Sequence, residues 1–82
     1  MSNRFDFAEL LQFYVNKSGY TTGQLSKRSG IPKPTIVNWL EGRVRRPRSW
    51  QDLVKLAKAL RLRQAEVGKL LKSARHPTPL EL

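Results

Sequence analysis

The sequence contains no cysteine, and only six Asp and Glu residues accompany sixteen Lys and Arg residues. Without cysteine, disulfide bonds and thiolate metal sites are excluded, so a hydrophobic core has to stabilise the fold. No apolar run is long enough for a transmembrane helix. The first apolar segment carries Asp6 and Glu9 and does not resemble a signal peptide, so we expect a cytoplasmic protein.

Catalytic residues are also scarce. The sole histidine, His76, lies near the C-terminal end, and the six carboxylates are scattered along the chain. This composition offers neither a nucleophile with an adjacent base nor a metal cluster. We therefore expect neither an enzyme nor a bound cofactor or metal.

What the sequence has in excess is positive charge. The formal net charge is +10, which is more than a small domain needs for solubility. Such an excess predicts a polyanionic partner. A basic amphipathic helix on an anionic membrane is an alternative, but a pattern typical of a globular core disfavours it.

The chain is large enough for one modest core. It has 82 residues, of which 39% are hydrophobic, including two Trp, two Tyr and three Phe. We predict one domain over residues 1–74. The segment His76-Pro77-Thr78-Pro79 cannot continue a helix, so residues 75–82 are predicted to be a tail or a truncated linker.

Apolar residues recur at helical spacing and nowhere alternate with a period of two, which predicts an all-α fold. Helices are expected over about 7–18, from a cap at Thr21 or Thr22 to about residue 29, from Pro32 or Lys33 to about residue 41, from Trp50 to about residue 60, and over about 64–73. Glycines at 19, 30 and 42 are expected to end the first three. The predicted core consists of Phe7, Leu10, Leu11, Tyr14, Val15, Leu25, Ile36, Trp39, Leu40, Trp50, Leu53, Val54, Leu56, Ala57, Leu60, Val67, Leu70 and Leu71.

An arginine-rich segment follows the third predicted helix. Arg43, Arg45, Arg46 and Arg48 place four guanidinium groups within six residues. A guanidinium can hold a phosphate through two hydrogen bonds or enter a narrow minor groove. A solvated basic loop is the alternative. The segment directly follows the third predicted helix, a candidate for base contacts in DNA, and this position favours contacts with the DNA backbone or minor groove.

The third predicted helix carries a polar outer face. Lys33 can donate to guanine and Asn38 can pair with adenine, whereas Pro34, which offers no hydrogen-bond donor, can read only shape or an apolar surface. These considerations predict base contacts, although a polar face can also be merely solvated. The candidate residues are Lys33, Pro34, Thr35, Val37 and Asn38.

The start of the second helix is a candidate phosphate site. Thr21, Thr22 and Gln24 can direct amides and polar groups at a phosphate, a role compatible with plain helix capping. Trp39 and Trp50 are assigned to the core rather than to base stacking. Seven further cations are expected on solvated faces, where they add to the long-range field: Lys27, Arg28, Lys55, Lys58, Arg61, Lys69 and Lys72.

The pattern L-S-x-x-S-G-I-P-K-P-T-I-x-x-W-L-E-G, from Leu25 to Gly42, resembles the helix-turn-helix of the Cro and phage-repressor (Xre-like) family, and the resemblance extends over about residues 6–72. It implies a compact five-helix, lambda-repressor-like bundle that places its third helix in the major groove. By the same resemblance Lys33, Pro34, Thr35 and Asn38 face bases, and Thr22 and the four arginines contact phosphates or the minor groove. The chain departs from the family in Ser26, where alanine is common, and in Leu40, where glutamate is common.

These observations predict sequence-specific binding of double-stranded DNA, as a transcriptional regulator or as its N-terminal DNA-binding domain. The alternative is a protein-interaction, antitoxin or adaptor module with secondary nonspecific DNA affinity. The partner is double-stranded DNA, bound either as a homodimer or by a domain joined to further domains.

Overall fold

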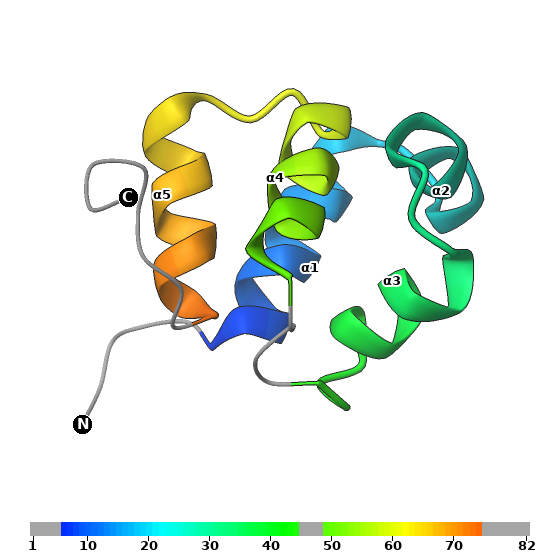
Figure 1. Cartoon of the computed structure of the whole chain (residues 1–82), viewed down its shortest axis with the longest axis horizontal. Coiled ribbons are helices and arrows are strands. Elements are labelled where there is room, and N and C mark those ends of the chain that lie inside the picture. The colour runs from blue at the N-terminus through cyan, green and yellow to red at the C-terminus, as the bar shows by residue number, and fades with distance from the viewer. Residues whose placement is uncertain (1–5, 45–48, 75–82) are drawn as a thin grey trace.

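The structure is a computed structural model that describes residues 6–44 and 49–74. These residues form five helices and no strand, which confirms the all-α prediction: α1 (Phe7–Ser18), α2 (Thr22–Ser29), α3 (Lys33–Leu40), α4 (Trp50–Ala59) and α5 (Gln64–Ser73). Helix α5 packs against α1 and α4, while α2 and α3 pack against each other on the opposite side of α4 (Figure 1). Helix α3 also packs against α1. None of the helices in the described ranges is long and apolar enough to cross a membrane.

Side chains cap several helix starts. Asp6 Oδ1 accepts a hydrogen bond from the Glu9 amide at 2.8 Å, and Ser49 Oγ accepts from the Asp52 amide at 3.3 Å. At α5, Glu66 Oε1 accepts from the Arg63 amide at 2.9 Å. Arginine has no acceptor to return the bond, so only half of a capping box forms there.

Glycines end α1 and α2 and follow α3. Gly19, Gly30 and Gly42 each adopt a φ of +77°, the left-handed conformation that strains any residue with a β-carbon. The three predicted helix ends are therefore confirmed. The short turn at Gly30 keeps α2 and α3 in contact, and α3 in turn packs against α1.

The core agrees closely with the predicted one. Leu40, Trp50, Val54 and Val67 are only partly buried and pack against its edge. The sequence pattern does not predict the burial of Ala59, Ala74 or Ile31, and Ile31 is 3% exposed although it lies in the turn after Gly30. The buried residues are Phe7, Leu10, Leu11, Tyr14, Val15, Leu25, Ile31, Ile36, Trp39, Leu53, Leu56, Ala57, Ala59, Leu60, Leu70, Leu71 and Ala74.

Trp39 joins α3 to α1. Its indole is 4% exposed and meets the Phe7 ring edge to face, with the ring centroids 6.1 Å apart. Such a pair adds to the free energy gained from burying the two rings. Trp39 is therefore a core residue, as the sequence predicts. The predicted tail, residues 75–82, lies outside the described residues, so the boundary at residue 74 stays a prediction.

We expect Trp39→Ala to lower the free energy of unfolding by about 3–5 kcal/mol, because it removes a buried aromatic side chain and leaves a cavity. A domain of this size has a total stability of only about 4–12 kcal/mol. Urea unfolding followed by circular dichroism measures the loss. Phe13→Ala is the control: Phe13 is 52% exposed, so this change should cost less than about 1 kcal/mol. Similar losses for both variants would contradict the assignment.

Candidate nucleic-acid interface

Serine hydroxyls fix the turn between α2 and α3. Ser26 Oγ donates to the Ile31 carbonyl at 2.6 Å, and Ser29 Oγ accepts from the Ile31 amide at 3.1 Å while it donates to the Leu25 carbonyl. The buried side chains of Leu25 and Ile36 lie on the two helices that the turn joins. Ser26, a departure from the common alanine, thus contributes a hydrogen bond of its own to the turn.

Helix α3 has one buried and one solvent-facing side. Ile36 and Trp39 are buried, whereas Lys33 and Pro34 are exposed. The three other predicted base-contact residues, Thr35, Val37 and Asn38, are half-buried. The structure therefore brings all five to the parts of α3 that the core leaves accessible.

The backbone at the start of α3 offers little to an anion. Pro34, at the second helical position, has no amide hydrogen. The amides of Thr35 and Ile36 both donate to the Pro32 carbonyl, at 3.0 and 3.3 Å. Among the amides of this first turn only that of Lys33 has no hydrogen bond within the described residues. Recognition by α3 would therefore depend on side chains.

The start of α2 is different. A complete capping box joins Thr21 and Gln24: Thr21 Oγ1 accepts from the Gln24 amide at 3.1 Å, and Gln24 Oε1 accepts from the Thr21 amide at 2.9 Å. The capping alternative considered for Thr21 is thus observed. Within the described residues, the amides of Thr22 and Gly23 make no hydrogen bond. These two amides are the donors that α2 could offer to a phosphate.

Arg43 contacts two residues near the end of α3. Its Nη2 atom lies 3.1 Å from Glu41 Oε1, and its Nη1 atom donates to Asn38 Oδ1 at 3.4 Å. The Arg43 amide also donates to the Asn38 carbonyl at 3.0 Å. The other three predicted loop contacts, Arg45, Arg46 and Arg48, lie outside the described residues.

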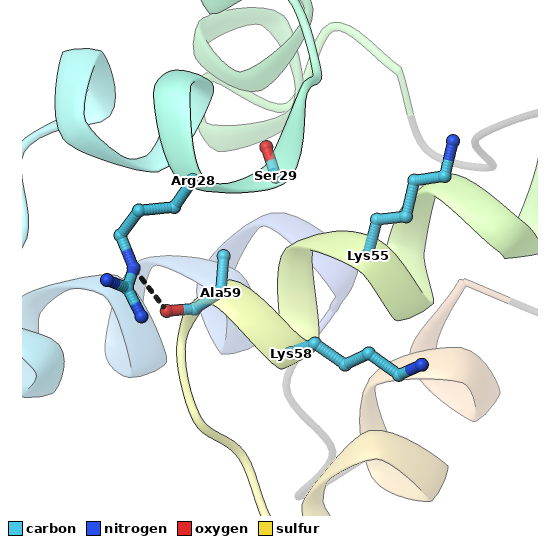
Figure 2. Close-up of a pocket in the computed structure, with 5 residues that line it drawn as sticks. All are labelled: Arg28, Ser29, Lys55, Lys58 and Ala59. Carbon is cyan, nitrogen blue, oxygen red and sulfur yellow. Dashed lines mark hydrogen bonds between the residues drawn. The ribbon is translucent and has the colours of Figure 1, made fainter.

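Arg28, which is expected on a solvated face, also makes two contacts within the protein. Its Nε atom donates to the Ala59 carbonyl at 3.2 Å, and its guanidinium lies 4.7 Å from the centroid of the Tyr20 ring. Figure 2 shows the bond to Ala59, which joins the last turns of α2 and α4. Arg28 is exposed, as expected of a residue on a solvated face, and its cation also satisfies a carbonyl at a helix end.

The same close-up shows a hollow between α2 and α4, lined by Arg28, Ser29, Lys55, Lys58 and Ala59. The two lysine side chains extend away from Arg28 (Figure 2). Lys55 Nζ lies 3.9 Å from Asp52 Oδ1, and both lysines are exposed, as the sequence analysis expects. The three cations therefore do not converge on one point.

Titratable and metal-ligating groups add no second site to the described part of the chain. Burial raises the pKa of the Tyr14 hydroxyl, and the negative charge of Glu66 raises it further, so Tyr14 packs as a neutral core side chain. In residues 6–44 and 49–74, no three His, Cys, Asp or Glu residues lie close enough to hold a metal ion.

Two short helices joined at a left-handed glycine, the second with one face in the core and the other accessible, define a helix-turn-helix, a class of DNA-binding domain. The family model for the helix-turn-helix domain matches residues 6–71, and the chain belongs to this family. Comparison with curated proteins and with solved structures gave no match.

We expect Arg28→Ala to lower the free energy of unfolding by about 1 kcal/mol, because it removes a charged hydrogen bond and a cation–π contact at a partly exposed site. Lys27→Ala, an exposed lysine on the same helix, should change it by less than about 0.5 kcal/mol. Urea unfolding at matched ionic strength measures both. Equal effects would mean that the contact with Ala59 contributes no stability.

Proposed function

We propose that the chain is a sequence-specific double-stranded DNA-binding domain of the Cro and phage-repressor (Xre-like) type, serving as a transcriptional regulator or as its N-terminal part. The accessible side of α3 is the observation that supports this most. It presents Lys33, Pro34, Val37 and Asn38 beside one another, while Trp39 on the other side holds the helix in the core. An α-helix of this kind fits the width of the major groove.

In this proposal the side chains along α3 read bases. Lys33, in the first turn, donates to the acceptors of guanine, and Asn38 pairs with adenine. Thymine methyl groups are contacted by Thr35, Val37 or Pro34, and Pro34 can also read the shape of the groove. The backbone supports a reading through side chains, because Pro34 has no amide and the Thr35 amide is already bonded.

Phosphate contacts come from two other places. At α2, the amides of Thr22 and Gly23 face a phosphate while the capping box of Thr21 and Gln24 holds the turn in shape. After α3, the sequence supplies Arg45, Arg46 and Arg48 for the backbone or the minor groove. The net charge of +10 attracts the duplex at long range.

Selection of bound duplexes from a random DNA pool at about 0.15 M salt tests the proposal, because nonspecific attraction is already weakened at that salt concentration. We expect an enriched motif, and its symmetry tells a homodimer from a monomer. Salt-sensitive binding without enrichment would leave a nonspecific basic domain, or a protein-interaction module of the adaptor type, and would overturn the proposal.

Asn38→Ala should then weaken binding to the selected motif by about 1–3 kcal/mol and leave binding to random DNA unchanged, because it removes a base contact. Titrations of labelled duplexes with the variant measure both affinities. Equal losses on the motif and on random DNA would contradict base reading by Asn38.

Gly23 offers a sharper test of the phosphate site at α2. A β-carbon there would meet only Thr21 Oγ1, at 3.9 Å, so the fold itself does not require glycine at this position. Gly23→Ala should raise the free energy of unfolding by about 0.5 kcal/mol. The new methyl group points toward the helix start, where it would hold a phosphate away from the amides, so binding should weaken on all DNA sequences.

Gly68→Ala is the matched control. It replaces another helical glycine, in α5, where a β-carbon meets nothing within 4 Å. This variant should gain stability in the same way and bind DNA like the unmodified chain. Unchanged DNA affinity for Gly23→Ala would show that no phosphate approaches the start of α2.

A further inference from the structure

Asn38, Glu41 and Arg43 form a connected group where α3 ends. Glu41 Oε1 lies 3.1 Å from Arg43 Nη2, and Asn38 Oδ1 lies 3.4 Å from Arg43 Nη1. The backbone supports the same arrangement, because the Arg43 amide donates to the Asn38 carbonyl at 3.0 Å. Arg43 is thus attached to Asn38 by both its main chain and its side chain.

The chemistry of the two side chains favours one orientation of the Asn38 amide. A guanidinium has donors and no acceptor, so the atom that faces Arg43 is the amide oxygen and not the nitrogen. The amide nitrogen of Asn38 therefore points away from Arg43. Without this neighbour, the side-chain amide of an asparagine could rotate by half a turn and exchange its donor and its acceptor. The arrangement of donor and acceptor presented to a base edge would then no longer be unique.

Glu41 keeps Arg43 in place. Its carboxylate takes one nitrogen of the guanidinium, which leaves the other for Asn38. The ion pair is exposed, with 70% of the Arg43 and 49% of the Glu41 side chain accessible, so it contributes little to the stability of the free protein. When a duplex covers this end of α3 and excludes water, the same contacts become stronger.

We infer that Arg43 is a positioning residue for base reading by Asn38, and not a clamp for a DNA phosphate as the sequence alone suggests. Arg43 takes one lone pair of Oδ1. The second lone pair and the amide hydrogens remain for the N6 and N7 atoms of an adenine. This inference rests on the proposed function, since it assigns the residue that sets the specificity of the same interface.

A double-mutant cycle on the full 82-residue chain tests the inference. Asn38→Ala first identifies the base pair at which discrimination is lost. Arg43→Lys, which keeps the charge and loses the planar fork, should then lower discrimination at that base pair about tenfold, within the range of one good base contact. Its affinity for random DNA should stay within about twofold of that of the unmodified chain. In the Asn38→Ala background, Arg43→Lys should cause no further loss of discrimination.

Glu41→Gln provides an independent test of the same inference. Releasing Arg43 from the carboxylate should lower discrimination at the same base pair, while the loss of a negative charge strengthens binding to random DNA. All three side chains lie at least partly at the surface, and circular dichroism checks that each variant is folded.

Three outcomes would overturn the inference. A phosphate clamp predicts that Arg43→Lys keeps full discrimination or weakens all duplexes alike. Additive losses of discrimination in the double variant would show that Arg43 does not act through Asn38. Failure of the unmodified chain to select any motif would overturn the proposed function together with this inference. That outcome can be told from failure of the inference alone, because it is observed with the unmodified chain before any variant is measured.

Discussion

The burial of Ile36 and Trp39 determines which side of α3 meets the solvent. Trp39 packs edge to face against Phe7 of α1, and Ile36 is fully buried. Since successive residues of a helix turn by about 100°, fixing these two positions also fixes the outward direction of the others. The presentation of Lys33, Pro34 and Asn38 is therefore a consequence of core packing.

The sequence predicts local features of the fold accurately. Left-handed glycines, capping side chains and apolar spacing are properties of neighbouring residues. They are enough to predict the observed bounds of α1 and α5 and the left-handed helix ends at Gly19, Gly30 and Gly42. The burial of Ile31 could have been inferred from the turn, because an apolar residue directly after a left-handed glycine often packs against the last turns of the preceding helix.

Contacts between distant segments could not be predicted in this way. Arg28 and Ala59 are 31 residues apart, and only the packing of α2 on α4 brings them together. At the candidate interface, helical spacing identifies the accessible residues of α3. It does not reveal that Arg43 faces Asn38 and Glu41, because those contacts depend on the left-handed turn at Gly42.

The two sides of α3 are subject to separate constraints. The hydrogen bonds that hold the turn come from Ser26 and Ser29 of α2, and the packing comes from Ile36 and Trp39, so neither depends on an exposed side chain such as that of Lys33. Substitutions of the exposed side chains on the outward side are therefore close to neutral for folding. Selection for a new binding preference can proceed through single replacements, each of which leaves a folded protein, and one scaffold can diverge into many recognition specificities.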